Sequence, residues 1–131
     1  MLSAGDTFIS PLPKQPVEHL FIALTDPDTS NKAVCVNLTS VNSVSDQTTV
    51  CRKGEHPYIT HDSAVFYAEA MLVDMEQLDV GLAPGGPIPG LRADAPCSPA
   101  FLRRVRAGLL ASPETPPHIK AACLSLWGPN P

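Results

Sequence analysis

The sequence predicts a mainly β domain with C-terminal helices, of the α+β class. Two apolar runs of strand length, residues 19–25 and 33–38, are each followed by hydroxyl or acidic residues, so neighbouring strands would bring polar side chains out at corresponding ends. The chain has 15 prolines, which indicates short elements joined by stiff loops. Two proline-led apolar stripes at helical spacing occupy the last third. These observations together predict a small β-barrel core followed by helices.

Composition indicates one globular domain. The chain has 131 residues, of which 44% are apolar and 17% charged, enough to bury a core but not to divide into two. We expect the barrel core in residues 1–80, a Gly/Pro linker in 81–97 and the helices in 98–127. The start lacks the pattern of a secretory signal and the longest apolar segment is too short to span a bilayer, so we expect a soluble cytoplasmic protein with no membrane partner.

The charge pattern counts against a general nucleic-acid binder. The formal net charge is -4, whereas broad binding to nucleic acid needs a cationic face. Basic residues gather at Arg52–Lys53 and within residues 103–106, and the second group fits a solvated helix flank. Only a local basic patch remains compatible with this balance.

Four short strands are predicted in the first half of the chain, over residues 5–9, 19–25, 33–38 and 48–52. Pro11 and Pro13 cannot donate ladder hydrogen bonds, so we expect the first strand to end before them and residues 10–16 to form a loop. The Asp- and Asn-rich segment 26–31 predicts a turn between the second and third strands. A turn at Lys53–Gly54 closes the fourth strand.

The sequence of residues 64–78 fits either a helix or a strand. Apolar side chains recur at helical spacing between Val65 and Met75, whereas Val65, Tyr67 and Val73 fit the alternation of a strand. A short helical turn over residues 75–78 fits both alternatives. Gly and Pro dominate the following stretch to residue 96, which predicts a surface linker.

The helices of the last third have clear start signals. Ser98 before Pro99 predicts a helix N-cap with proline in the first turn, and the apolar stripe that follows predicts a helix over residues 99–111. Thr115 with Pro116 repeats this signal and predicts a second helix that ends near Trp127. We expect the two helices to pack across the barrel.

The cysteines and histidines give no metal-binding pattern. Cysteines 35, 51, 97 and 123 are widely spaced and form no C-x-x-C pair, so reduced thiols are expected. The four histidines form neither a His-x-His nor a His-Glu-x-x-His pair. We therefore expect neither a metal nor a cofactor.

Several short motifs follow one another in a set order along the chain. Gly5–Asp6 opens the first strand, a second strand ends in a hydroxyl residue, and a third ends in Thr39–Ser40. A Ser-x-Val strand beginning at Ser63, the helical turn at 75–78 and the helix from Pro99 come next. This order of elements resembles the MazF/PemK family of toxin ribonucleases.

The resemblance implies an SH3-like barrel, usually a homodimer, that cleaves single-stranded RNA without a metal. In this family the 2′-hydroxyl of the substrate is the nucleophile and a cyclic phosphate is left. Such chemistry needs a general base, donors to the phosphoryl oxygens and a general acid. The resemblance also implies an antitoxin partner whose acidic, flexible tail lies over the RNA groove.

Matched position by position, Thr39 falls on the threonine of the family, while His19 and Leu20 fall on its Arg-Pro pair. Histidine acts as acid or base near neutral pH, which arginine does not readily do, but it is a poorer fixed cation for phosphate. The hypothesis assigns catalysis to His19, Thr39, His56 and His61, and RNA contacts to Arg52, Lys53, Tyr58 and Ser40.

Each of these assignments has a plainer alternative. Thr39 and Ser40 also fit the end of a strand, where their hydroxyls bond the following backbone. A lone histidine also fits a surface or capping position, and Asp62–Ser63 fits a helix N-cap if residues 64–78 are helical. The corresponding alternative function is a non-catalytic SH3-like barrel that binds a protein or nucleic acid.

Overall fold

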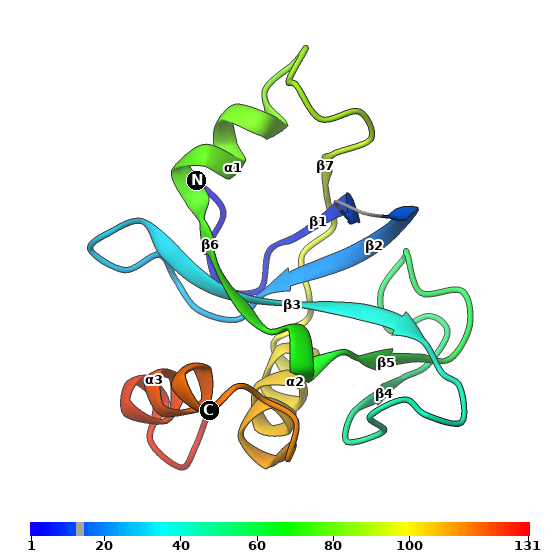
Figure 1. The fold of residues 1–131 in the computed structure, drawn as a ribbon, viewed down its shortest axis with the longest axis vertical. Coiled ribbons are helices and arrows are strands. Elements are labelled where there is room, and N and C mark those ends of the chain that lie inside the picture. The colour runs from blue at the N-terminus through cyan, green and yellow to red at the C-terminus, as the bar shows by residue number, and fades with distance from the viewer. Residues whose placement is uncertain (13–14) are drawn as a thin grey trace.

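A computed structural model describes residues 1–12 and 15–131 of the chain. Figure 1 shows an antiparallel sheet with α1 on one side and α2 and α3 on the other. The strands are β1 (Thr7–Leu12), β2 (Gln15–Ala23), β3 (Lys32–Ser40), β4 (Val50–Cys51), β5 (Ser63–Val65), β6 (Met71–Asp74) and β7 (Arg92–Asp94). The helices are α1 (Met75–Leu82), α2 (Pro99–Ala111) and α3 (Pro117–Trp127), with a 3-10 turn, η1, at Tyr67–Glu69.

The sheet is open. Its strands follow the order β4-β5-β3-β2-β1-β7, and β6 also pairs with β3. In the part of the chain that the structure describes, β4 and β7 end this order and do not pair with each other. The mainly β, α+β class is thereby confirmed, whereas the closed SH3-like barrel is not confirmed.

The central strand, β3, has two partners along one edge. Its first half pairs with β6, from Lys32 opposite Asp74 onward, and its second half pairs with β5 up to Ser40 opposite Ser63. Its other edge pairs with β2, with Phe21 opposite Asn37. Since the partner along one edge changes within a single strand, β3 joins the two parts of the sheet.

Both faces of β3 are buried, which explains why its sequence is a continuous apolar run. Val34, Val36 and Leu38 belong to the larger core, whereas Ala33 and Cys35 belong to the smaller one. A strand covered on both faces has no solvent side that would require polar residues. The apolar run predicted the strand correctly for this reason.

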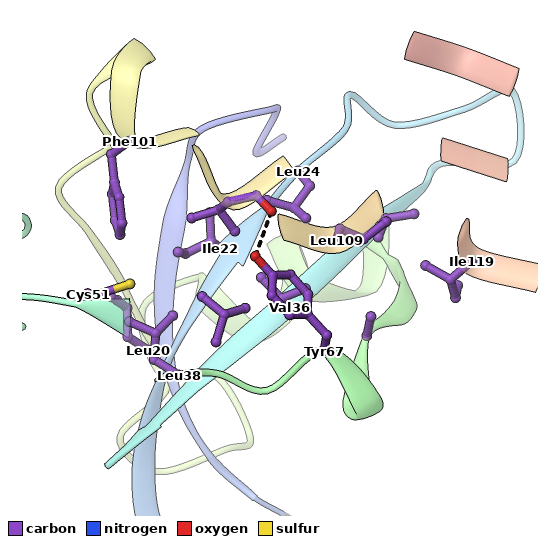
Figure 2. Packing of buried hydrophobic residues seen from close by; sticks show 14 of the residues in the cluster. Leu20, Ile22, Leu24, Val36, Leu38, Cys51, Tyr67, Phe101, Leu109 and Ile119 are labelled. Carbon is purple, nitrogen blue, oxygen red and sulfur yellow. Dashed lines mark hydrogen bonds between the residues drawn. The ribbon is translucent and has the colours of Figure 1, made fainter. Parts of the chain in front are cut away.

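The larger core lies between the sheet and the two C-terminal helices (Figure 2). Phe101 and Leu109 of α2 and Ile119 of α3 pack there against Ile22 and Val36 of the sheet. Burial of one such side chain contributes about 1.5–3 kcal/mol. This contact between helices and sheet is therefore a main source of stability.

The smaller core lies on the opposite face of the sheet, under α1. Phe8 and Phe21 of neighbouring strands stack there with ring centroids 5.0 Å apart. Met75 and Leu78 of α1 cover them. The helix thus protects the face that α2 and α3 leave open.

The prediction that the first strand ends before Pro11 is wrong. β1 continues to Leu12, and Pro11 pairs with Glu18 of β2. β7 pairs with β1 only from Thr7 to Ile9, so β1 has a free edge at Pro11, where a missing N–H group is tolerated. The expected loop over residues 10–16 overlaps both strands, and Pro13 lies outside the described residues.

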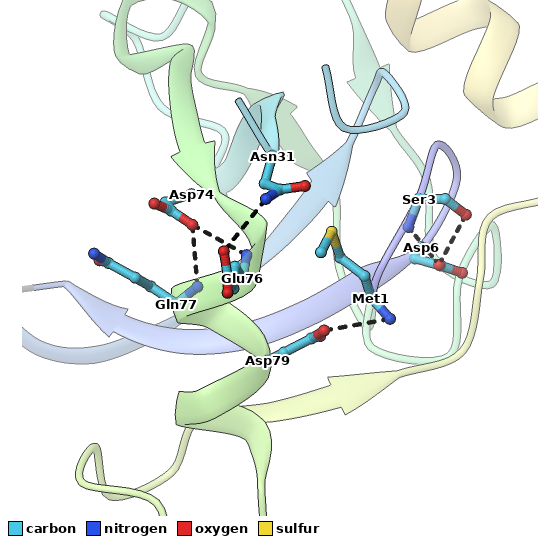
Figure 3. A network of polar contacts seen from close by, with 8 residues as sticks. All are labelled: Met1, Ser3, Asp6, Asn31, Asp74, Glu76, Gln77 and Asp79. Carbon is cyan, nitrogen blue, oxygen red and sulfur yellow. Dashed lines mark hydrogen bonds and ion pairs between the residues drawn. The ribbon is translucent and has the colours of Figure 1, made fainter. Parts of the chain in front are cut away.

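Residues 64–78, whose sequence fits either a helix or a strand, contain both. β5, η1 and β6 occupy residues 63–74, and α1 begins at Met75. No helix begins at Asp62–Ser63; the side chain that caps α1 is Asp74, which accepts hydrogen bonds from the backbone N–H groups of Glu76 and Gln77 (Figure 3). The predicted turn at residues 75–78 is the first part of this longer helix.

The Gly- and Pro-rich stretch after α1 is more than a connection. Arg92 to Asp94 form β7, which lies beside β1. The Arg92 guanidinium makes two hydrogen bonds to the Glu18 carboxylate of β2, at 3.0 and 3.2 Å. A partner 74 residues away in sequence thus fixes a segment whose composition suggested only a loop.

The helix predicted over residues 99–111 is confirmed as α2, and its Ser98 Oγ accepts from the N–H of Phe101 at 3.1 Å. The second helix is confirmed as α3, but Thr115 does not cap it. Its hydroxyl donates instead to the Leu109 carbonyl at 2.7 Å, which ties the connection to the end of α2. No helix in residues 1–12 and 15–131 is long and apolar enough to cross a membrane.

A buried polar contact joins α2 to the sheet layer. The Tyr67 hydroxyl donates to the Val105 carbonyl at 2.7 Å, so the Thr49 hydroxyl donates to the Tyr67 oxygen, 2.8 Å away. Burial raises the pKa of Tyr67 far above its usual range. Gly108 of α2 leaves the space for this pair, because a Cβ there would lie 2.0 Å from Thr49 Oγ1 and 2.1 Å from the Tyr67 hydroxyl.

Replacing Gly108 with alanine is expected to lower the free energy of unfolding by about 1–3 kcal/mol, as overpacking does in other cores. A decrease in stability would be informative, because alanine normally stabilises a helix interior relative to glycine by about 1 kcal/mol. Urea denaturation followed by Trp127 fluorescence measures the change. Gly81→Ala in α1 is the matched control, since its methyl would meet only the mobile end of Leu91, and equal losses in both variants would contradict this packing.

Candidate functional site

A groove of about 310 Å³ opens where β2 and β3 diverge. The loop between β4 and β5 forms its other wall. Five of the eight predicted site residues line it, and they come from three separate parts of the chain. The lining residues are Val17, Glu18, His19, Leu20, Leu38, Thr39, Ser40, Tyr58, Ile59, Thr60, His61 and Ser63.

His19 takes the place of a backbone partner at the end of the β2–β3 ladder. The last paired residues there are Phe21 and Asn37, and beyond them His19 Nδ1 lies 2.9 Å from the Leu38 carbonyl. A carbonyl oxygen only accepts, so Nδ1 carries the proton. In the neutral ring Nε2 then holds the lone pair, and this buried atom has no hydrogen-bond partner among the described residues.

Thr39 lies on the same face of the sheet as His19. His19 is two residues before Phe21, and Thr39 is two residues after its partner Asn37, so strand alternation places both side chains on one face. Both line the groove. The β2–β3 register therefore brings these two candidate residues to the same face at the groove.

Ser40 and His61 form a second polar pair in the groove. The Ser40 hydroxyl lies 2.9 Å from His61 Nε2, and Thr60 Oγ1 lies 3.4 Å from Nδ1 of the same ring. Both residues are exposed. A hydroxyl that donates to an imidazole is a pairing that activates oxygen nucleophiles, and an exposed imidazole can also deliver a proton.

Tyr58 adds an aromatic surface to the groove. Its side chain is half-buried and lines the groove, and burial raises the pKa of its hydroxyl. Glu18 lies at the same wall, paired with Arg92, and this hydrogen bond lowers the pKa of the Glu18 carboxyl. The groove thus combines an aromatic ring, hydroxyls and two imidazoles with one paired carboxylate.

The structure does not bring His56 into the groove. Its side chain is 2% exposed, and its Nδ1 accepts from the Tyr58 N–H at 3.1 Å. Nε2 therefore donates, to the Ala95 carbonyl 2.6 Å away, with Thr7 Oγ1 at 3.4 Å. Both ring nitrogens are occupied by protein groups, so His56 joins the groove loop to the segment after β7.

The two basic residues predicted to contact RNA also lie outside the groove lining. Arg52 forms an ion pair with Asp62, and its backbone N–H donates to Glu55 Oε2 at 2.6 Å. Lys53 is exposed in the turn that follows β4. Neither Lys nor Arg occurs among the groove-lining residues of the described chain.

Sequence reasoning missed Glu18 and Thr60. The significance of Glu18 depends on Arg92, a distant partner that no local pattern indicates. Thr60 directly precedes His61, and this adjacency of a hydroxyl and an imidazole was the available signal. In the described residues, no three His, Cys, Asp or Glu side chains gather in a way that would hold a metal ion.

Comparison with protein-family models, with curated proteins and with solved structures gives no match. The function is therefore argued from the groove itself.

An ion pair holds the groove loop against α2. The Arg104 guanidinium bonds both oxygens of Glu55, with Nη2 to Oε2 at 2.8 Å, and also donates to the Val50 carbonyl. The hydrogen bond from Arg104 is the largest cause that lowers the pKa of Glu55, from 4.5 to about 2. The loop that carries Tyr58 and His61 is thus fixed at its base by this charge pair.

Because the folded-state pKa of Glu55 is depressed, its contribution to stability is present above pH 4.5 and is lost as the pH falls toward 2. Glu55→Gln is expected to destabilise the protein by about 1 kcal/mol at neutral pH, a modest value because the pair is partly exposed. This difference from wild type should shrink through that acid window in urea titrations. Glu69→Gln, at an exposed site, is the control; a Glu55→Gln deficit that does not change with pH would contradict the assignment.

Proposed function

We propose that the chain is a metal-independent endoribonuclease that cleaves single-stranded RNA in the groove between β2 and β3. The observation that carries the proposal is the fixed tautomer of His19, whose Nδ1 is held by the Leu38 carbonyl while Nε2 keeps an unpartnered lone pair. A positioned imidazole with a free lone pair is a general base. A second imidazole, His61, lies in the same groove and supplies the acid.

In the proposed reaction, His19 Nε2 takes the proton of a substrate 2′-hydroxyl as that oxygen attacks the adjacent phosphorus. Protonated His61 gives a proton to the leaving 5′-oxygen, and a cyclic phosphate remains. The hydroxyls of Thr39 and Ser40 donate to the phosphoryl oxygens, and Tyr58 stacks on a base. Since Nε2 is covered in this structure, the substrate reaches it only when neighbouring groove side chains move.

The resemblance to MazF/PemK toxins agrees with this chemistry and extends the proposal. It adds an SH3-like fold, a homodimer, a cytoplasmic location and an antitoxin partner. These additions rest on the order of elements and on short motifs such as Thr39–Ser40. His19 replaces the family arginine, so the proposed enzyme uses an imidazole where its relatives carry a fixed cation.

The alternative, a non-catalytic module that binds a protein or nucleic acid, is favoured by a different observation. Among the described residues, the groove lining contains Glu18 but neither Lys nor Arg. Arg52 and Arg92, the nearby cations, are already paired with Asp62 and Glu18. A groove of this polarity suits a neutral or cationic peptide better than a polyanion.

Cleavage of a mixed-sequence single-stranded RNA in the presence of a chelator tests the enzyme. Wild-type protein is expected to give fragments that end in cyclic phosphate, and His19→Gln and His61→Gln are each expected to lower the rate by about 100-fold or more, the usual contribution of a general base or acid. Electrophoresis and mass spectrometry of the products measure both effects.

His118→Gln is the matched control, because His118 is exposed on α3 and outside the groove lining; it should cleave like wild type. RNA in which every 2′-hydroxyl is methylated should stay intact. An inactive wild-type protein, or groove variants as active as wild type, would refute the enzyme, and peptide binding that the groove variants abolish would then support the alternative.

A further inference from the structure

A second cavity lies at the opposite end of β3 from the groove. It has a volume of about 440 Å³ and opens between the turn before β3, β6 and the two C-terminal helices. Val34, Leu72, Leu126 and Trp127 form an apolar wall. Cavities of this size hold small organic ligands, whose apolar parts pack on such walls.

Arg106 of α2 lines this cavity in a fixed position. Its Nε donates to the Leu24 carbonyl at 2.8 Å, and the guanidinium carbon lies 5.0 Å from the centre of the Trp127 ring. These two contacts hold the plane of the guanidinium from two sides. Among the described residues, the two terminal NH₂ groups of Arg106 make no hydrogen bond and no ion pair.

The other three arginines that are fixed by polar contacts differ from Arg106. Arg52, Arg92 and Arg104 each bond a carboxylate of this chain. Arg106 is positioned by a backbone carbonyl and an aromatic ring. Its two terminal NH₂ groups, the fork that would bind a carboxylate, are unused. A planar fork of this kind recognises a carboxylate through two parallel hydrogen bonds.

The remaining charges of the cavity favour a ligand with one negative charge over a more highly charged anion. Lys32 adds a cation, but Asp26 and Asp28 also line the cavity. Backbone N–H groups of Lys32 and Ser30 lower the pKa of Asp28, so this carboxylate stays charged at neutral pH. Two aspartates would repel a phosphate ester, which carries more charge than one carboxylate.

We propose that this cavity binds a monocarboxylate carried on a branched aliphatic or aromatic body. The carboxylate accepts two hydrogen bonds from the Arg106 fork, while the body packs against Leu72, Leu126 and Trp127. The carboxylate comes either from a free small molecule or from the C-terminus of a peptide that ends in an apolar residue. This site is separate from the groove and does not depend on RNA cleavage.

Titration calorimetry of the full chain with 4-methylpentanoate and phenylacetate tests the proposal, with the primary amide of each acid as the neutral match. Each acid is expected to bind roughly tenfold or more tightly than its amide, as a charge-assisted pair requires. Peptides that end in leucine, as the free acid or the amide, form the second arm. Binding by the small acids identifies a free ligand, and binding by the free-acid peptide alone identifies a chain terminus.

Leu126→Glu places a negative charge in the apolar wall and is expected to weaken binding of the acids by about tenfold or more through like-charge repulsion. Leu126 is 65% exposed, so the fold should tolerate the change. Leu124→Glu, on the same helix but outside the cavity lining, should bind like wild type. Arg106→Lys, which keeps the charge but loses the fork, should also weaken binding.

Three results would overturn the proposal. The first is equal affinity for an acid and its amide, the second is unchanged binding by both Leu126→Glu and Arg106→Lys, and the third is no binding by any acid or peptide. Melting curves of each variant separate a lost site from a lost fold. Because RNA cleavage is read independently, failure of this site leaves the proposed function of the groove unaffected.

Discussion

The burial and pairing of β3 on all sides is the constraint on which the rest of the structure depends. Two different layers cover its faces, and β2, β6 and β5 share its edges. At the change of partner from β6 to β5, the Asn37 carbonyl accepts from the N–H of Phe66 at 2.8 Å, so the backbone stays bonded across the junction. The side chains of β3 enter both cores, which hold α2 and α3 on one face and α1 on the other, and the groove and the second cavity lie at its two ends.

The candidate site follows from the same constraint. Where the β2–β3 ladder ends, the Leu38 carbonyl would lose its partner, and a buried carbonyl without a hydrogen bond costs about 1–3 kcal/mol. His19 satisfies it with Nδ1–H, and this use of one ring nitrogen leaves Nε2 unpartnered. By meeting this backbone requirement, the fold sets the orientation of the ring that we propose as the general base. The buried Asn37 Oδ1 also has no hydrogen-bond partner among the described residues, so two buried polar atoms near this end of β3 are unpaired.

The sequence pattern correctly predicted those elements whose structure depends on neighbouring residues in the chain. The apolar run of β3 and the Ser98 cap of α2 could be read directly, whereas β7 could not, because its pairing depends on β1 and on the distant Glu18–Arg92 contact. The same limit applies to the site. His19 and His61 were found with the groove residues around them, but His56 has the same sequence signal and a different role, since only the fold shows that both its nitrogens are bonded.

The distribution of positive charge restricts how the two hollows can work. No Lys or Arg among the described residues lines the groove, so the donors it offers a phosphate are hydroxyls and imidazoles. The cavity at the other end of β3 instead contains a fixed guanidinium whose two terminal NH₂ groups are unused. In the reaction proposed for the groove, one imidazole takes a proton while the other gives one. An arginine in place of His19 would offer a planar fork of donors for phosphate, whereas the imidazole offers a ring nitrogen, Nε2, that can exchange a proton.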